Sequence, residues 1–222
     1  MTVAGAPGFG RQYFETAYSD YERQNPPWKL QFYRRLIEDS LEHPSGRRTI
    51  LEIGCGLGSF LASLDARWSK YGFDVSAYAV GRAREKNPGA QLVVASGTRI
   101  PFARRFDAIV SFDVLEHLAD PGAALDEVAQ HLEPSGVFAF VVPVYDGLSG
   151  PIIRLLDHDV THLQKHGREF WLRLASRRFQ VLAWQGLTRY LLPGGVYLNW
   201  PTTIWRHHTP AIAVVARLNG SR

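Results

Sequence analysis

The chain has little cysteine and no long apolar segment. Cys55 is the only cysteine among 222 residues, which excludes an internal disulfide framework. No apolar run reaches the roughly 18 residues that a membrane-spanning helix needs. The N-terminus, Met-Thr-Val-Ala-Gly-Ala-Pro-Gly, lacks the charged and apolar regions of a signal peptide. We therefore expect a cytoplasmic protein without a transmembrane segment.

The chain also lacks a strong excess of charge of one sign. It has 25 Lys and Arg against 21 Asp and Glu, a formal net charge of +4. Its basic residues form only short pairs, such as Arg34-Arg35 and Arg177-Arg178, which solvated helix faces explain better than a nucleic-acid-binding patch. The length and a hydrophobic fraction of 45% suit one packed α/β domain with appendages.

Apolar segments alternate in a pattern that predicts a parallel α/β sheet. The expected strands lie near residues 49–53, 70–74, 91–95, 106–112 and 137–142. The expected helices between them lie near 58–66, 76–86 and 121–132. A helix at 167–176 and two last strands at 179–184 and 211–218 complete the prediction. We expect residues 1–46 to form a helical cap on a main domain at 47–222, with a polar loop at 143–166.

A glycine-rich turn follows the first expected strand. Residues 49–60 read Thr-Ile-Leu-Glu-Ile-Gly-Cys-Gly-Leu-Gly-Ser-Phe. Gly54, Gly56 and Gly58 lack a Cβ atom, so they permit positive φ and let a ligand approach the backbone. The segment is therefore a strand-to-helix turn at the carboxyl edge of the sheet, where open α/β sheets bind nucleosides.

Two carboxylates accompany this turn. Asp74 ends the next apolar run, at about the distance where acidic residues accept hydrogen bonds from ribose hydroxyls. Glu52 stands just before the turn, where it would repel a pyrophosphate and attract an ammonium group. The third glycine also comes one residue earlier than in the dinucleotide pattern Gly-x-Gly-x-x-Gly. These features favour a nucleoside cofactor with an ammonium group over a nicotinamide dinucleotide.

The segment from Glu52 to Gly58 resembles the first motif of class I S-adenosylmethionine-dependent methyltransferases. Residues 106–118, Phe-Asp-Ala-Ile-Val-Ser-Phe-Asp-Val-Leu-Glu-His-Leu, are similar to the fourth-strand motif of the small-molecule branch of that family. The resemblance is close over residues 47–145. It implies a Rossmann-like sheet of seven mostly parallel strands, with helices on both faces and a C-terminal antiparallel hairpin.

The resemblance also implies the positions that bind S-adenosylmethionine. Ser96 stands where the family commonly has an Asp for the adenine amino group, and a hydroxyl can accept the same hydrogen bond. An aromatic N-terminal helix covers the cofactor in related enzymes, so one of Tyr13, Tyr18 and Tyr21 is expected to line the site. The expected cofactor contacts are Glu52, Gly54, Cys55, Gly56, Gly58, Asp74, Val75, Ser96, Gly97, Phe112, Asp113 and His117.

Two histidines are candidates for proton transfer, His162 first and His117 second. A neutral imidazole at about pH 7 can take the proton of a hydroxyl or amine acceptor. His158 and His166 share helical spacing with His162, but no Glu stands in an HExxH arrangement and Lys165 adds positive charge. The pair equivalent to Glu116-His117 is associated with a divalent cation in some quinone-pathway O-methyltransferases, but the pair alone does not complete a coordination shell. No metal site is therefore predicted.

An aromatic, lid-like insertion is expected at residues 186–210. Its apolar surface either packs on the domain or a second subunit, as in a homodimer, or closes over an apolar or aromatic acceptor. Arg189, Arg206, His207 and His208 are expected to hold an anionic group on that acceptor. The apolar residues are Leu187, Tyr190, Leu191, Leu192, Val196, Tyr197, Leu198, Trp200, Ile204 and Trp205.

The sequence thus predicts methyl transfer from S-adenosylmethionine to a small molecule, at O, N or C. Two alternatives remain open at this point. One is a nicotinamide-dependent oxidoreductase, which the glycine spacing and Glu52 disfavour. The other is a non-catalytic protein that retains the cofactor-binding fold.

Overall fold

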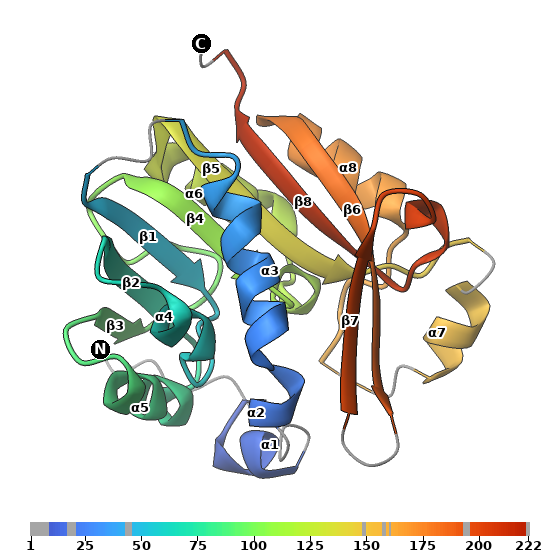
Figure 1. Cartoon of the computed structure of the whole chain (residues 1–222), viewed down its shortest axis with the longest axis horizontal. Helices are drawn as coiled ribbons and strands as arrows, with labels where there is room; N and C mark the ends of the chain where they lie inside the picture. Colours follow the sequence, from blue (N-terminus) through green and yellow to red (C-terminus); the bar gives the residue numbers. More distant parts are fainter. Residues whose placement is uncertain are drawn as a thin grey trace.

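A single mixed sheet forms the centre of the molecule (Figure 1). The computed structural model describes residues 9–16, 21–42, 46–147, 150–156, 159, 161–192 and 196–220. Within them, the sheet has eight strands in the order β3-β2-β1-β4-β5-β8-β6-β7, of which β1 to β5 run parallel. Their bounds are β1 Arg48–Ile53, β2 Trp68–Asp74, β3 Gln91–Val94, β4 Phe106–Phe112, β5 Leu132–Pro143, β6 Phe179–Leu192, β7 Val196–Thr202 and β8 Ala211–Leu218.

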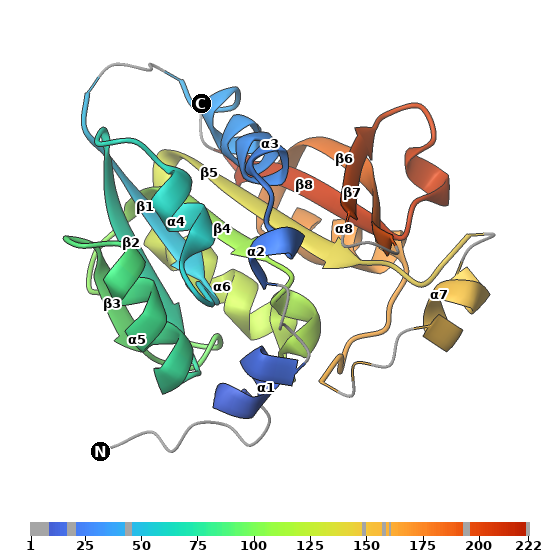
Figure 2. The same ribbon diagram turned by 60° about the horizontal axis from the view of Figure 1, so that its bottom comes forward.

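Helices cover both faces of the sheet, as predicted (Figure 2). On one face lie α3 (Pro27–Glu38), α4 (Ser59–Ser63) and α5 (Ala77–Lys86), and on the other α6 (Pro121–His131) and α8 (Arg168–Ser176). Neighbouring strand residues point to opposite faces, so Ile50 packs with the first set and Leu51 with the second. The remaining short helices are α1 (Arg11–Thr16), α2 (Tyr21–Gln24), α7 (Gly150–Leu156) and the 3₁₀ turns η1 (Leu115–His117) and η2 (Arg206–His208).

Local sequence signals explain where the helices begin. Pro26 and Pro27 stand at the start of α3, where a missing backbone N–H costs nothing. Ser76 caps α5 by accepting a hydrogen bond from the Ala79 amide at 3.2 Å. Asp120 caps α6 in the same way through the Ala123 amide at 3.0 Å. The helix α3 buries Tyr33, Leu36 and Ile37 against the sheet, so it belongs to the packed core.

The prediction of seven strands is wrong, because the segment after residue 186 continues the sheet. Strand β6 extends to Leu192 and pairs with β7 in antiparallel register, with Arg189 opposite Asn199. Pro193, Gly194 and Gly195, between the two strands, lie outside the described residues. Pro201 within β7 suits an edge strand, where one side of the backbone has no partner.

In the part of the chain that the structure describes, no helix combines the length and apolar character that a membrane crossing requires.

Candidate active site

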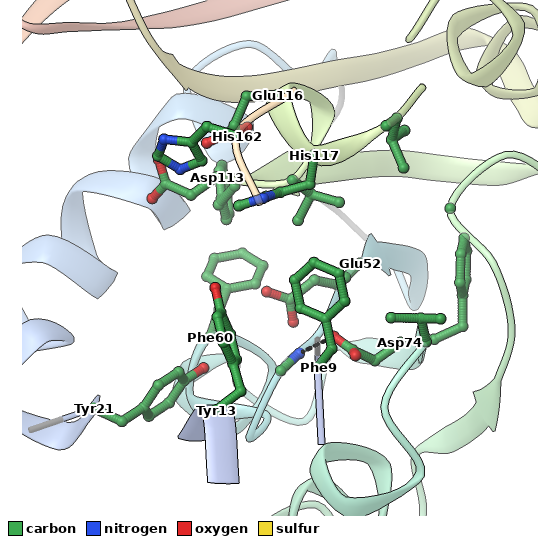
Figure 3. Close-up of a pocket in the computed structure, with 18 of the residues that line it drawn as sticks. Phe9, Tyr13, Tyr21, Glu52, Phe60, Asp74, Asp113, Glu116, His117 and His162 are labelled. Carbon is green, nitrogen blue, oxygen red and sulfur yellow. Dashed lines mark hydrogen bonds between the residues drawn. The ribbon is translucent and has the colours of Figure 1, made fainter. Parts of the chain in front are cut away.

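One cavity of about 560 Å³ lies at the carboxyl ends of β1, β2 and β4. Its volume falls within the range typical of small-molecule sites, about 300–1,000 Å³. Figure 3 shows Glu52 and Asp74 on one side of it and Glu116, His117 and His162 on the other. The sequence-predicted residues that line it are Glu52, Gly54, Gly56, Asp74, Val75, Ser96, Gly97, Phe112, Asp113, His117 and His162.

The glycine turn forms one wall of the cavity in the backbone conformation that glycine allows. Gly54 has φ 69° and Gly56 has φ 48°, which side-chain-bearing residues rarely adopt. A Cβ on Gly56 would lie 3.0 Å from the Tyr21 hydroxyl, inside the cavity. The turn therefore exposes backbone to any ligand in this cavity.

Two residues of the turn, Cys55 and Gly58, do not line the cavity. Cys55 is 2% exposed and packs in the apolar core that α3, α4 and α5 share with the sheet. Gly58 precedes α4 with φ 77°, and a Cβ there would lie 2.9 Å from the Cβ of Ala83. The structure thus gives both residues packing roles beneath the turn.

Asp74 is fixed by backbone amides. Its Oδ2 accepts a hydrogen bond from the Gly56 amide and its Oδ1 one from the Ser76 amide, both at 2.9 Å. Burial raises the pKa of its carboxyl, and the Ser76 and Gly56 amides oppose that shift. The carboxylate is thus held rigidly at the cavity wall, with further lone pairs for ligand hydroxyls.

Glu52 is a buried acid with an unused acceptor. It is 5% exposed, and its Oε2 has no hydrogen-bond partner among the described residues. Burial and then the neighbouring Asp74 raise the pKa of Glu52 well above its ordinary value. An ammonium group of a ligand would satisfy the orphaned oxygen and restore the charged carboxylate.

Ser96, Gly97 and Thr98 line a further part of the cavity wall. The hydroxyl of Ser96 lies 3.1 Å from that of Thr98. Gly97 leaves no room for a side chain, because a Cβ would lie 2.8 Å from Leu118. Aromatic side chains from the N-terminal segment also line the cavity, and they include Tyr13 and Tyr21 of the three predicted tyrosines. Tyr18 lies outside the described residues.

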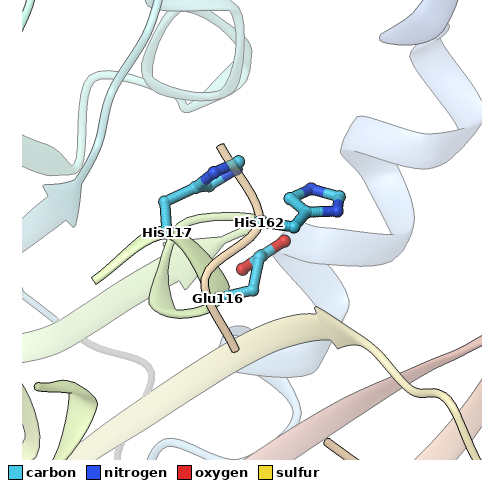
Figure 4. Close-up of side chains that lie close together, drawn as sticks. All are labelled: Glu116, His117 and His162. Atoms are coloured by element: carbon cyan, nitrogen blue, oxygen red, sulfur yellow. The ribbon is translucent and has the colours of Figure 1, made fainter. Parts of the chain in front are cut away.

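A second polar group gathers around His117 and His162. Ligand atoms of Glu116, His117 and His162 lie within 4.8 Å of one another, which the sequence did not indicate (Figure 4). His158 lies outside the described residues, and His166 stacks on Phe170 at 3.8 Å between ring centroids. Of the two described histidines of this loop, His162 belongs to the group around His117 and His166 does not.

Hydrogen bonds orient the two rings of this group differently. The Nδ1 of His117 lies 3.1 Å from the backbone oxygen and 2.9 Å from the hydroxyl of Thr161. Because a carbonyl only accepts, the ring donates from Nδ1 in its neutral form, and Nε2 keeps its lone pair. Burial, and then His162, lower the pKa of His117 below its ordinary value. His162 contacts the Tyr145 hydroxyl at 3.1 Å through Nδ1 and lies 3.8 Å from Asp159 through Nε2.

An ionic group occupies the end of the cavity nearest the β6–β7 hairpin. Asp113, which has an unusual φ of 58°, receives two 2.6 Å contacts from Nη1 of Arg189. Lys29 lies over the ring of Tyr197, with its Nζ 4.9 Å from the ring centroid. Tyr33 stacks on Phe112 at 4.0 Å between ring centroids.

Sequence reasoning missed Lys29 and Tyr33, although a signal was present. The two residues lie four apart on the apolar face of α3, where a buried lysine interrupts the pattern. Of the residues expected to hold an anionic group, Arg189 does line the cavity. The sequence also assigned Arg206, His207, His208 and the exposed tryptophans to the site. Arg206 instead lies over the Trp184 ring at 4.1 Å, and none of these residues lines the cavity.

The alternation of side chains in the hairpin explains that error. Tyr197 and Arg189 face the cavity, so Leu198 and Trp200 point to the opposite face of the strands. Trp200 is 71% exposed and Trp205 is 68% exposed. Some of the apolar residues expected to form a lid have side chains that the structure describes, and among these Tyr197 alone lines the cavity.

The sheet order, the glycine turn and the two carboxylates define a class I methyltransferase fold. The family model described as "Methyltransferase domain" matches residues 21–190, and the chain belongs to that family. An uncharacterized methyltransferase of Mycobacterium sp. (strain JLS) is 27% identical over 201 residues, 82% of this chain and 79% of the relative. Trans-aconitate 2-methyltransferase of Azoarcus sp. (strain BH72) is 33% identical over 110 residues, 48% of this chain and 44% of the relative.

Solved structures agree on the fold. The N-methyltransferase NodS from Bradyrhizobium japonicum, in complex with S-adenosylhomocysteine, has a TM-score of 0.61 at 18% identity, and the match covers 86% of each chain. The chain is therefore an S-adenosylmethionine-dependent methyltransferase. The orphaned oxygen of Glu52 fits the ammonium group of that cofactor.

Proposed function

We propose that His117 is the general base of this methyltransferase, with His162 as its neighbour and positioning partner. The proposal rests mainly on the contact between Nδ1 of His117 and the Thr161 carbonyl, since it leaves Nε2 free to accept a proton. The geometry thus favours the reverse of the order expected from the sequence. Both nitrogens of His162 face protein groups, those of Tyr145 and Asp159.

The chain's residues would act mostly by positioning. S-adenosylmethionine supplies an activated methyl group, so no covalent enzyme intermediate is needed. Glu52 would hold the ammonium group of the cofactor and Asp74 its ribose hydroxyls, while Ser96 and Gly97 would border its adenine ring. Phe60 and Phe112 form an apolar wall beside them. Holding the acceptor in attack geometry contributes most of the rate, and His117 removes the proton of a hydroxyl or amine.

An apolar or aromatic acceptor is the second part of the proposal. Aromatic side chains line much of the cavity, and they include Phe9, Tyr13, Phe60, Phe112 and Tyr197. Such walls favour a planar or apolar molecule over a strongly hydrated one.

Methyl transfer into a metabolite extract tests both parts. The protein is incubated with isotope-labelled S-adenosylmethionine, and labelled products are identified by mass spectrometry. We expect one or a few labelled small molecules with an apolar or aromatic skeleton. Incorporation only into protein or nucleic acid would contradict the proposal.

Treatment with a chelator tests whether the group of Glu116, His117 and His162 binds a metal or supplies a general base. We expect full activity after dialysis against EDTA. Loss of activity that a divalent cation restores would make this group a metal site and would remove the base assignment.

Two further expectations, a homodimer and a cytoplasmic location, complete the proposed function. Exposed Trp200, Ile204 and Trp205 support a homodimer, which light scattering after gel filtration tests. A cytoplasmic location remains a prediction, to be tested by cell fractionation.

A further inference from the structure

The cavity end between α3 and the β6–β7 hairpin holds two cations, Lys29 and Arg189, and the carboxylate of Asp113. Asp113 forms its salt bridge with Arg189. Nearby Glu116 is buried, and burial and then Asp113 raise the pKa of its carboxyl well above its ordinary value. Of the two cations, Lys29 is therefore the one that no salt bridge pairs with a carboxylate of the described residues.

Lys29 is the cation that protein groups satisfy least. It is 6% exposed, and its Nζ donates a hydrogen bond to the Gln24 carbonyl at 3.0 Å. No carboxylate of the described residues lies within salt-bridge distance of it. A buried ammonium without a counter-ion is costly, and such groups are usually paired. The aromatic rings of Tyr33 and Tyr197 provide only partial compensation.

Arg189 presents an edge that Asp113 does not use. Both contacts to Asp113 come from Nη1, whereas a paired carboxylate commonly spans two nitrogens of the guanidinium. Nε and Nη2 make no salt bridge with a described carboxylate. The hydroxyls of Tyr33 and Tyr197 lie beside this guanidinium and accept from it, and the buried Tyr33 hydroxyl has no acceptor for its own proton among the described residues.

We propose that Lys29 and Arg189 form an anion subsite that holds a carboxylate of the methyl acceptor. This inference rests on the proposed function, and it narrows the acceptor to an organic acid. A monoanion gives Lys29 a counter-ion, whereas a phosphate dianion would bring further negative charge against Asp113. The Tyr33 hydroxyl is a donor to the same anion, and the aromatic walls hold the rest of the molecule.

Anion exchange of the metabolite extract tests the charge of the acceptor before the acceptor itself is identified. The extract is divided at pH 8 into flow-through and salt-eluted fractions, and each is assayed for methyl acceptance. We expect acceptance in the salt-eluted fraction, and it should survive phosphatase treatment. Acceptance in the flow-through, or its loss after phosphatase treatment, would overturn the carboxylate assignment.

Variants of Lys29 test whether this residue belongs to the subsite and whether the bound carboxylate is that of the acceptor or that of the cofactor. Lys29→Met should raise the KM for the salt-eluted acceptor at least tenfold and leave the affinity for S-adenosylhomocysteine unchanged. Lys29→Arg should bring the KM for the acceptor most of the way back to the wild-type value. Lys70→Met is the matched control, because Lys70 donates to the Leu64 carbonyl and does not line the cavity. A tenfold loss of S-adenosylhomocysteine affinity in Lys29→Met would show that the subsite holds the cofactor's own carboxylate, and it would overturn the proposal.

A binding measurement separates failure of the subsite from failure of the methyltransferase assignment. The protein saturated with S-adenosylhomocysteine is titrated with benzoate and with benzamide. We expect tighter binding of benzoate, and loss of that preference in Lys29→Met, whether or not turnover is detected. Equal binding, or no binding of benzoate, would contradict the subsite. Methyl acceptance in neither fraction would contradict the proposed function.

Discussion

At the residue scale, the acids of the cofactor wall and Arg189 of the acceptor end were predicted, whereas Lys29 and the pairing of Arg189 with Asp113 were not. Glu52 and Asp74 stand next to the glycine turn and the strand ends, so local patterns identify them. The Asp113–Arg189 pair joins residues 76 positions apart, and no local pattern encodes that contact. The order of His117 and His162 likewise depends on Thr161, Tyr145 and Asp159, whose positions only the folded chain defines.

Removing the Asp74 carboxylate should weaken cofactor binding. In Asp74→Ala we expect the binding free energy for S-adenosylhomocysteine to weaken by about 1.5–3 kcal/mol, since a charged acceptor of buried hydroxyls is lost. Asp74→Asn should be intermediate, because the amide keeps one acceptor oxygen. Isothermal titration calorimetry measures both, and unchanged affinity in the alanine variant would remove the ribose assignment.

The pH profile of turnover should identify His117. A general base must be neutral, so kcat falls as pH drops through its pKa. Burial lowers the pKa of His117 from its ordinary value of 6.5, and the acid limb should therefore lie below pH 6.5.

Two variants complete that measurement. His117→Gln should lower kcat by about 10²–10⁴-fold, the usual contribution of a base, and abolish the limb. His162→Gln should lower kcat but keep the limb. If the limb persists in His117→Gln and disappears in His162→Gln, the base is His162.

At the scale of elements, the parallel part of the sheet and its helices were predictable because hydrophobic alternation and capping residues are local. Strand β4 and the predicted range coincide at residues 106–112. The β6–β7 hairpin was not predictable in the same way. Polar Thr188, Arg189 and Asn199 lie among its apolar residues without a regular alternation, so no period of two marks the strands in the sequence.

The glycine turn supports a prediction at this scale. Gly56→Val would place a branched side chain at φ 48° and at the Tyr21 hydroxyl, within the space of the cofactor. We expect loss of detectable S-adenosylhomocysteine binding and a loss of stability of about 1–3 kcal/mol from backbone strain.

Gly81→Ala is the matched control, because a Cβ at Gly81 in α5 meets no atom within 4 Å. It should bind normally and gain up to about 1 kcal/mol of stability from helix propensity. Thermal unfolding and calorimetry measure both effects. Wild-type affinity in folded Gly56→Val would contradict the cavity wall described above.

At the scale of the whole molecule, one cavity joins two differently charged regions. Glu52 and Asp74 come from the parallel half of the sheet, and they suit a cofactor with an ammonium group and a ribose. Lys29 comes from α3, before the cofactor motifs in the chain, and Arg189 comes from the β6–β7 hairpin after them. The fold therefore brings Lys29 and Arg189 together from segments that the cofactor motifs do not include, and this explains why the sequence indicates the cofactor more closely than the acceptor.

The buried charge of Lys29 should make global stability depend on pH. Burial, opposed by Asp113, lowers its pKa from 10.5 to about 8. Between those values the unfolded chain binds more protons than the folded one, so the free energy of unfolding rises with pH. From pH 7.5 to 9.5 we expect Lys29 to contribute a rise of about 1–2 kcal/mol.

Lys29→Met should lack this rise and should be the more stable protein at pH 7. The difference between wild type and variant, from urea unfolding at each pH, cancels groups common to both, such as Lys70. Measurements stop at pH 9.5, because Tyr33 lies beside Lys29 and therefore has different surroundings in the two proteins. Burial raises the pKa of Tyr33, and its stabilising contribution is lost from about pH 10 upward, where the unfolded chain begins to ionise. A constant difference across the range would mean that Lys29 titrates like an exposed lysine, and the argument from its buried charge would then fail.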